Sequence, residues 1–200
     1  METKTLIPTD IPVILASNSP RRRALLTEMG LMFAVTSPDA DESYPPMMHP
    51  HEAVRFIAEK KARAVAEKRA AENAGKAVII ASDTLVEVDG EPLGKPTDAE
   101  DAARMLRLLS GRHHNVHTGV CVIYGKQMLS AVDTTDVFFL PLDEGDIRGY
   151  IASGEPMDKA GAYAIQGIGG KYVSHVNGHM DTVIGLPCEL LEELLAKLVF

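Results

Sequence analysis

The chain has 200 residues, of which 46% are hydrophobic and 24% are charged, and its formal net charge is −8 at pH 7. These values fit one domain over residues 1–200, with a sizeable core and no run of about 18 apolar residues that could span a membrane. The acidic charge argues against general nucleic-acid binding, which depends on neutralising backbone phosphates, but a local basic pocket could still bind a small phosphorylated ligand.

The first predicted elements are a strand and a helix, joined by a basic turn. Residues 11–15 are apolar, and Ser17–Arg23 then has the sequence Ser-Asn-Ser-Pro-Arg-Arg-Arg. Ser19 suits the N-cap of a helix, Pro20 its first position, and Gly30 its end. Free N–H groups at a helix start favour an anion, and arginines add bidentate donors for phosphate oxygens. An arginine triplet alone is more often a solvated turn, but its place after a buried strand predicts a phosphate site.

The rest of the chain alternates predicted strands and helices, which is typical of an α/β protein. Up to residue 109 we expect a strand at 31–36, a loop at 37–50, a helix at 51–69, strands at 77–81 and 85–88, a hairpin turn at 89–90 and a helix opened by a capping box at 97–100. Beyond it we expect strands at 115–124 and 128–140, a helix at 143–152, a functional loop at 155–170, a hairpin of strands 171–176 and 180–184, and a helix at 187–200.

The second informative motif is Ala81-Ser82-Asp83-Thr84, which follows the apolar run 78–80. A carboxylate at the end of a buried strand lies where open α/β sheets place their active sites. There Asp83 could bind a metal ion or take a proton from water. The motif alone leaves a simpler role open, in which Asp83 caps a turn.

Three weaker motifs follow from the same sequence. Lys95 lies between a glycine and a proline, so its backbone is stiff and it could reach a phosphate, although no P-loop pattern is present. Glu42 belongs to an acidic cluster that is usually solvated but could complete a magnesium site. His113 and His117 would share one face of a strand, but no carboxylate or cysteine completes a plausible metal-binding set there, and we expect no metal at these histidines.

Together these motifs resemble the Maf family of nucleoside triphosphate pyrophosphatases, also known as septum-formation inhibitors. The resemblance runs from about residue 14 to residue 187, and the stretch 154–163 is similar to the subgroup that acts on dTTP and UTP rather than on 7-methyl-GTP. It rests on Ser17-x-Ser19-Pro20-Arg21-Arg22, Ala81-Ser82-Asp83-Thr84, Gly94-Lys95-Pro96, Leu109-Ser110-Gly111, His114-x-Val116-x-Thr118 and Ala160-Gly161-Ala162-Tyr163-x-Ile165-Gln166-Gly167.

The resemblance implies a single domain with an elongated, twisted mixed β-sheet flanked by helices, in two lobes with the active-site cleft between them. It also implies hydrolysis of a nucleoside triphosphate to the monophosphate and pyrophosphate, with Mg²⁺ or Mn²⁺ and with Asp83 as the catalytic base. Arg21, Thr84 and Gln166 fall on positions tied to substrate choice. The full set of implied contacts is Glu42 and Asp83 for the metal, and Ser17, Arg21, Arg22, Lys61, Thr84, Lys95, Lys159 and Gln166 for the substrate.

Two other functions stay open on sequence grounds. A related enzyme could hydrolyse modified or purine triphosphates, and a non-catalytic protein of this family could regulate cell division through protein partners. The sequence decides neither the preferred nucleotide nor whether the chain forms a homodimer. Cys121 and Cys188 lie in apolar segments without metal or redox spacing, and the first residues lack a signal-peptide pattern, so we expect a cytoplasmic location.

Overall fold

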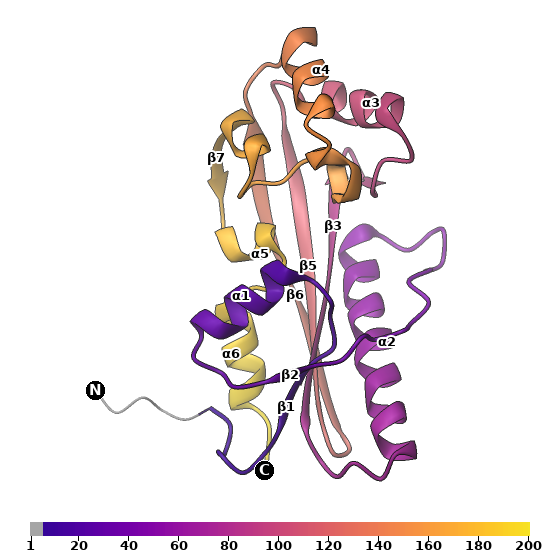
Figure 1. Cartoon of the computed structure of the whole chain (residues 1–200), viewed down its shortest axis with the longest axis vertical. Coiled ribbons are helices and arrows are strands. Elements are labelled where there is room, and N and C mark those ends of the chain that lie inside the picture. The colour runs from indigo at the N-terminus through magenta and orange to yellow at the C-terminus, as the bar shows by residue number, and fades with distance from the viewer. Residues whose placement is uncertain (1–5) are drawn as a thin grey trace, which may run out of the picture.

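A twisted seven-stranded sheet forms the long axis of the structure, a computed structural model that describes residues 6–200 (Figure 1). Its strand order is β2-β1-β3-β5-β6-β7, and β4 pairs with β3 beside this path. β1 is parallel to β2 and β3, and the other pairs are antiparallel, so the predicted mixed sheet is confirmed. The strands are β1 Val13–Leu15, β2 Ala34–Val35, β3 Val78–Val88, β4 Glu91–Leu93, β5 His113–Tyr124, β6 Gln127–Phe139 and β7 Val173–Asn177.

Helices cover both faces of the sheet. α2 lies on one face of its lower half in Figure 1, α1 and α6 lie on the other, and α3 and α4 form the upper end. Within residues 6–200 no helix is both long and apolar enough to cross a membrane. The helices are α1 Pro20–Glu28, α2 Pro50–Ala71, α3 Ala99–Leu109, α4 Glu144–Ala152, α5 Met180–Ile184 and α6 Cys188–Ala196, with 3₁₀ turns at Glu155–Asp158, Ala160–Ala162 and Ile168–Tyr172.

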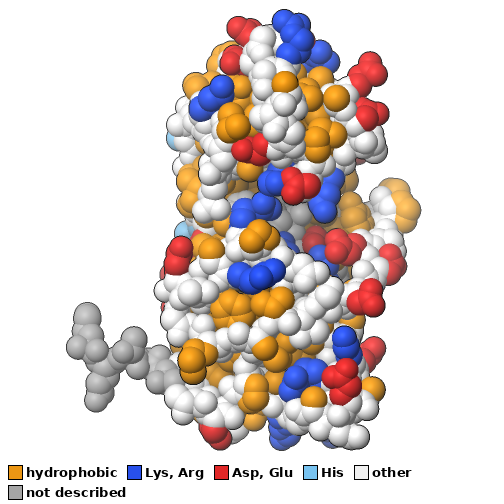
Figure 2. Space-filling view, viewed as in Figure 1, with side chains coloured by type: hydrophobic (Ala, Val, Ile, Leu, Met, Phe, Trp, Pro, Cys, Tyr) orange, Lys and Arg blue, Asp and Glu red, His pale blue; other side chains and the backbone are white. Residues whose placement is uncertain are grey.

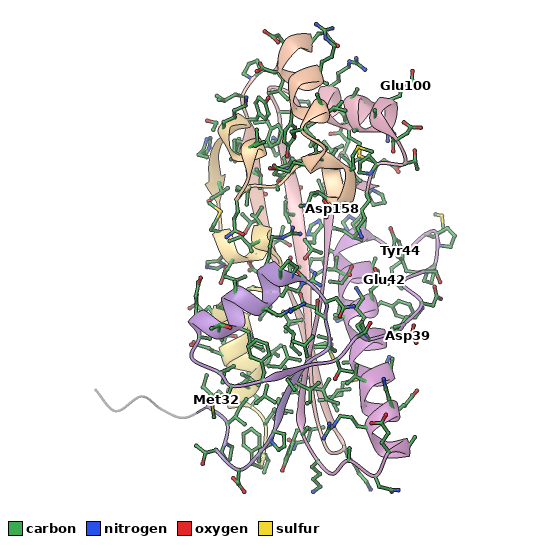
Figure 3. The ribbon with its side chains drawn as sticks, viewed as in Figure 1. Met32, Asp39, Glu42, Tyr44, Glu100 and Asp158 are labelled. Carbon is green, nitrogen blue, oxygen red and sulfur yellow. The ribbon has the colours of Figure 1, made fainter. Side chains whose placement is uncertain are left out.

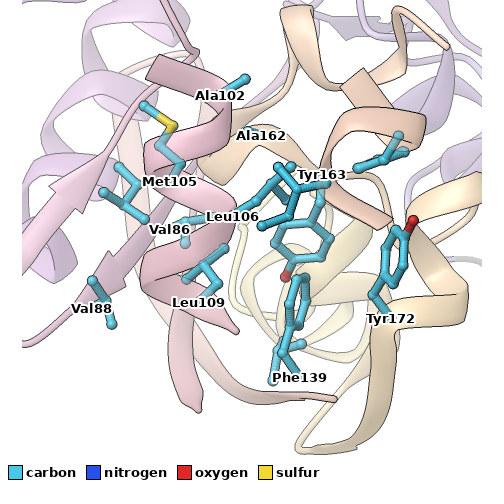
Figure 4. Packing of buried hydrophobic residues seen from close by; sticks show 14 of the residues in the cluster. Val86, Val88, Ala102, Met105, Leu106, Leu109, Phe139, Ala162, Tyr163 and Tyr172 are labelled. Atoms are coloured by element: carbon cyan, nitrogen blue, oxygen red, sulfur yellow. The ribbon is translucent and has the colours of Figure 1, made fainter. Parts of the chain in front are cut away.

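The molecule has two lobes because the long strands carry separate cores at their two ends. In the lower lobe, alternate residues of β3 point to opposite faces: Val78 and Ile80 pack toward α1 and α6, and Ile79 packs toward α2. In the upper lobe, Figure 4 shows Val86 of β3 packed with Leu106 of α3. β3, β5 and β6 run through both lobes and hold them together.

Gly119 of β5 allows α2 to lie directly on the sheet. A Cβ at this position would overlap the backbone carbonyl group of Val54 in α2. We expect Gly119→Ala to lower the free energy of unfolding by about 1 to 3 kcal/mol, the usual cost of overpacking a well-packed core. Urea unfolding followed by circular dichroism measures this change. Gly149→Ala in α4 is the matched control, because its added methyl group meets nothing within 4 Å; equal midpoints for the two variants would contradict the prediction.

The predicted hairpin at Asn177-Gly178 is wrong, because the segment that follows it is the helix α5 and not a strand. Gly178 adopts φ +130° and packs against Thr135 of β6. The Thr135 hydroxyl accepts the N–H of His179 at 2.9 Å and donates to the carbonyl oxygen of His179 at 3.0 Å. These bonds turn the chain away from the sheet after β7.

The N-cap of α3 is shifted by one residue from the predicted position, and its hydrogen bonds differ from those of the predicted capping box at 97–100. Asp98 and not Thr97 is the N-cap, and its carboxylate accepts the N–H of Asp101 at 2.8 Å. The Asp101 carboxylate in turn accepts the N–H of Thr97 at 3.1 Å. Two predicted elements are also shorter than expected: the strand at 31–36 covers Ala34–Val35, and the last helix ends at Ala196.

Candidate active site

A cleft of about 1030 Å³ lies between the two lobes, where β3 passes from one to the other. Figure 2 shows a hollow at mid-height of the molecule, with basic and acidic side chains around it. The structure brings all the residues predicted from the sequence to this cleft. They are Ser17, Arg21, Arg22, Glu42, Lys61, Asp83, Thr84, Lys95, Lys159 and Gln166.

The floor of the cleft is an open stretch of one edge of β3. On this edge β1 pairs with β3 only as far as Ile80, and β4 pairs with it only from Val86. Among the described residues, no strand pairs with residues 81–85 on this side. Asp83 therefore lies in the middle of a strand, and the prediction that it ends one is wrong. The strand that ends here is β1, so side chains from both faces of β3 reach the cleft.

Asp83 is the most deeply placed acid of the cleft, and it pairs with Lys61 of α2. The Lys61 Nζ lies 2.7 Å from Asp83 Oδ1 and 3.0 Å from Glu42 Oε1. The side chains of Lys61 and Asp83 are 7% and 10% exposed, whereas Glu42 is 61% exposed. Burial raises the pKa of Asp83 above its usual range, and the positive charges of Lys61 and Arg22 oppose this shift. A buried carboxylate and an accessible one thus share a single ammonium group.

Arg22 is fixed from three directions at the start of α1. Its Nε donates to the carbonyl oxygen of Gly185 at 2.8 Å, and its Nη2 donates to Thr84 Oγ1 at 3.1 Å. Its Nη1 donates to Ser17 Oγ at 3.4 Å. Burial lowers the pKa of Arg22, but a guanidinium stays protonated at physiological pH. The predicted start of this helix is confirmed: Ser19 is the N-cap and accepts the N–H of Arg22.

The end of α5 is a part of the site that the sequence analysis missed. Its carbonyl oxygens at Ile184 and Gly185 accept hydrogen bonds from Arg21 and Arg22, at 3.5 and 2.8 Å. Gly185 has φ +122°, and a Cβ there would lie 3.4 Å from the Nε of Arg22. The sequence Gly-Leu-Pro at 185–187 is a helix-stop signal. Because residues 180–184 were predicted to form a strand, this signal was not interpreted as the end of a helix.

The upper wall of the cleft comes from the turn after β4 and from the glycine-rich segment that follows α4. The N–H of Gly161 donates to the carbonyl oxygen of Gly94 at 3.0 Å, which ties the segment to the turn that carries Lys95. Lys159 forms an ion pair with Asp158 and, through this hydrogen bond, holds the pKa of Asp158 below its usual range. In Figure 3, Asp158 projects from the upper lobe, and Glu42 lies on the loop beside α2. The lobes thus face each other with charged side chains.

The charges of the cleft balance in number. Five lysines and arginines line it, and so do five aspartates and glutamates. Two of the acids, Glu42 and Asp83, converge on Lys61, and within residues 6–200 no group of three or more His, Cys, Asp or Glu side chains could hold a metal ion. The protein offers a cation at most a partial set of ligands here.

The histidine motif at residues 113–117 does not belong to the charged residues that line the cleft. His117 Nε2 lies 2.8 Å from Glu87 Oε2, a contact that the sequence did not indicate, but among residues 6–200 these side chains belong to no group of three or more that could hold a metal ion. His114 points to the other face of β5, where its Nε2 lies 2.8 Å from the Tyr163 hydroxyl. The two histidines are therefore separated by the sheet and serve the packing of its two sides.

The fold and the cleft define an α/β protein with a polar, two-lobed ligand site, whose floor carries a buried carboxylate and whose walls carry basic side chains. The Maf-like protein family matches residues 12–198, and the chain belongs to this family.

The chain is similar to several curated proteins over most of its length. It is 46% identical to the dTTP/UTP pyrophosphatase of Anaeromyxobacter dehalogenans (strain 2CP-C), with 94% of both chains covered. It is 45% identical to that of Pelotomaculum thermopropionicum, covering 92% of this chain and 95% of the relative, and 44% identical to that of Escherichia coli O157:H7, covering 92% and 91%. Among solved structures it is similar to the Ham1 protein of Staphylococcus aureus, with a TM-score of 0.49, 18% identity, and 92% of this chain and 97% of that chain covered.

Proposed function

We propose that this protein is an enzyme that hydrolyses dTTP and UTP to the nucleoside monophosphate and pyrophosphate. The observation that carries the proposal is the buried Asp83 on the floor of a cleft whose two walls present Arg21, Arg22, Lys95 and Lys159. A carboxylate that faces a ring of phosphate-binding groups suits water activation next to a bound triphosphate. The names of the relatives, dTTP/UTP pyrophosphatases at about 45% identity, support the same substrate class.

The triphosphate lies across the cleft in this proposal. Arg21 and Arg22 hold it from the lower lobe, where the start of α1 adds free N–H groups and a partial positive charge. Lys95 and Lys159 hold it from the upper lobe. Binding across two lobes orients the chain of phosphates, and orientation together with charge neutralisation accounts for most of the catalysis of phosphoryl transfer.

A divalent cation, Mg²⁺ or Mn²⁺, completes the site. Because the acidic and basic side chains of the cleft are equal in number, the protein alone offers no excess of positive charge to a triphosphate. Glu42 and Asp83 supply two hard oxygen ligands next to each other, and Mg²⁺ typically takes one or two carboxylates together with phosphate oxygens and water. When bound there, the cation would neutralise charge on the phosphate oxygens.

Asp83 acts as the general base. A water molecule attacks the α-phosphorus: a bond forms between the water oxygen and phosphorus, the bond from phosphorus to the bridging oxygen of the β-phosphate breaks, and Asp83 takes the proton. Lys61 fixes Oδ1 of Asp83 at 2.7 Å and so orients the carboxylate. The leaving pyrophosphate gains negative charge, which the arginines and lysines of the walls stabilise.

Gln166 selects the base. It lies on the upper wall with its side chain exposed to the cleft, and its amide offers both a donor and an acceptor to the edge of a pyrimidine. We expect Gln166→Ala to lower kcat/KM for dTTP and UTP by about tenfold or more and to reduce the preference over purine triphosphates, because a base that loses its polar partners is bound less selectively. Steady-state kinetics on each triphosphate measures this. An unchanged preference would remove Gln166 from base selection.

The test of the proposal is pyrophosphate release across a panel of canonical and modified triphosphates. We expect dTTP and UTP to have the highest kcat/KM. Fastest turnover of GTP, a modified purine triphosphate or 7-methyl-GTP would overturn the substrate assignment, and no turnover of any triphosphate would overturn the assignment as a hydrolase. We also propose a cytoplasmic location, and the free thiols of Cys121 and Cys188 are compatible with a reducing compartment.

A further inference from the structure

The segment that carries Gln166 is wrapped around a single carboxylate, that of Glu155. Glu155 follows α4 and opens the first 3₁₀ turn, 11 positions before Gln166 in the sequence. Its Oε2 accepts the N–H of Ile168 at 2.9 Å, and its Oε1 accepts the N–H of Gly169 at 3.1 Å. Both backbone groups lie just after Gln166, so they fix the chain on that side.

Tyr150 of α4 completes this arrangement on the other side of Gln166. Its hydroxyl donates to Glu155 Oε1 at 2.7 Å and accepts the N–H of Ala164 at 3.1 Å. The Tyr150 side chain is 1% exposed and packs in the upper core against Tyr172, so its hydroxyl has a fixed position. One tyrosine and one glutamate thus hold the 164–169 loop before and after Gln166. We call them the Tyr150–Glu155 pair.

The glycines of this loop are explained by the same contacts. A Cβ at Gly167 would overlap the Glu155 carboxylate, and a Cβ at Gly169 would overlap the Tyr150 hydroxyl. The backbone can approach the pair closely only because these two positions lack side chains. Although burial opposes it, the hydrogen bonds from Ile168, Gly169 and Tyr150 keep the pKa of Glu155 below its usual range, so the carboxylate is ionised and accepts these bonds strongly.

Besides the Tyr150–Glu155 pair, the loop is held by Ile165, which packs against the upper core, and by a hydrogen bond from the N–H of Gly167 to the carbonyl oxygen of Ala164 at 3.3 Å. Its middle residues Gln166, Gly167 and Ile168 are exposed, and its regular structure is the start of the 3₁₀ turn Ile168–Tyr172. Exposed segments with few buried contacts open at low free-energy cost, and a displacement of about 1 Å at a binding group can cost a large factor in rate or affinity. We infer that the Tyr150–Glu155 pair is a positioning device that holds the 164–169 loop so that Gln166 meets the base of the substrate. This inference rests on the proposed function.

Two isosteric substitutions test it. Glu155→Gln replaces one accepting oxygen with an NH₂ group, and Tyr150→Phe removes the hydroxyl that links Glu155 to Ala164. We expect each to raise KM about tenfold for the triphosphate that the wild type turns over fastest, with kcat changed less than about threefold, because binding and not the chemical step is affected. Amide hydrogen exchange at residues 164, 168 and 169 should become faster in both variants. The double variant should cost little more than either single one, since the two residues act as a unit.

The matched control is Glu144→Gln, in the same helix as Tyr150. The Glu144 carboxylate forms a bidentate pair with Arg107 at 2.7 and 2.9 Å and does not contact the loop. Its loss should leave KM and the loop amides unchanged. An unchanged KM in Glu155→Gln, or the same rise in KM in Glu144→Gln, would overturn the inference. The panel of triphosphates tested on the wild type checks the proposed function separately, because the KM comparison uses whichever triphosphate the wild type hydrolyses best. A wild type that hydrolyses no triphosphate would overturn both the proposed function and this inference.

Discussion

Replacing Asp83 with asparagine should lower kcat by about a hundredfold or more, the usual loss when a general base is removed. The asparagine keeps the shape of the side chain but cannot take a proton from water. KM should change much less, because the basic groups on both walls remain. Steady-state pyrophosphate release measures kcat and KM, and thermal unfolding shows whether the variant is folded.

Asp89→Asn is the matched control for this experiment. Asp89 lies at the turn that ends β3, is exposed, and pairs with Arg112 at 2.7 Å. Its φ of +54° is one that asparagine tolerates, so the control should fold and keep wild-type turnover. If Asp83→Asn retains more than about a third of wild-type kcat, the assignment of the base is wrong, since a general base contributes at least 10²-fold.

The pH dependence of the wild type gives a second measurement on the same residue. A general base works when it is deprotonated, so activity should fall as the pH is lowered through its pKa. Because burial raises the pKa of Asp83, this fall should begin at a higher pH than for an ordinary aspartate. An acidic limb of kcat/KM at the usual aspartate pKa would contradict the role of burial.

Local patterns predicted the residue types of the site, and the family resemblance implied that they share one cleft, but the contacts among them could not be predicted. The helix start at Ser19 and Pro20 was predictable because capping is a local property, and the structure has it where it was expected. The pairing of Lys61 with both Glu42 and Asp83 depends on how α2 lies on β5, which Gly119 permits. No local pattern of the sequence contains that contact.

The two errors near the site have the same physical origin. The polar residues Ser82 and Thr84 interrupt an apolar run and so imitate the end of a strand, but β5 pairs with β3 straight through them. Asn177-Gly178 is a strong hairpin signal, but bonds from Thr135 redirect the chain into α5. In both cases a partner distant in the sequence decides the structure. The glycine-rich loop at 155–170 was predicted to be functional, while the reason for two of its glycines, Gly167 and Gly169, lies in Glu155 and Tyr150.

Replacing Arg22 with alanine should weaken triphosphate binding by about 1.5 to 3 kcal/mol, the range for hydrogen bonds to charged groups. The physical reason is that Arg22 is held ready for an anion: the carbonyl oxygen of Gly185, Thr84 and Ser17 already fix its guanidinium at the cleft. Little conformational entropy is therefore lost when a phosphate binds. Calorimetric titration with a dTTP analogue that cannot be hydrolysed between the α- and β-phosphates measures the change.

Arg23→Ala separates this role from the general effect of positive charge. Arg23 belongs to the same triplet, but it is exposed, and its guanidinium donates to the carbonyl oxygen of Asn18 at 3.2 Å and to no other group among the described residues. Its loss should change affinity by less than about 0.5 kcal/mol, as for most surface substitutions. Arg22→Lys keeps the charge but cannot reproduce the planar fork, and it should lie between the wild type and Arg22→Ala. It also provides a second measurement if removal of the whole side chain disturbs the contact between α1 and α5. A folded Arg22→Ala variant with wild-type affinity, or an equal loss of affinity in Arg23→Ala, would assign the arginine turn to the solvated surface. If the turn binds phosphate, the fixed guanidinium of Arg22 must contribute more to affinity than the exposed one of Arg23.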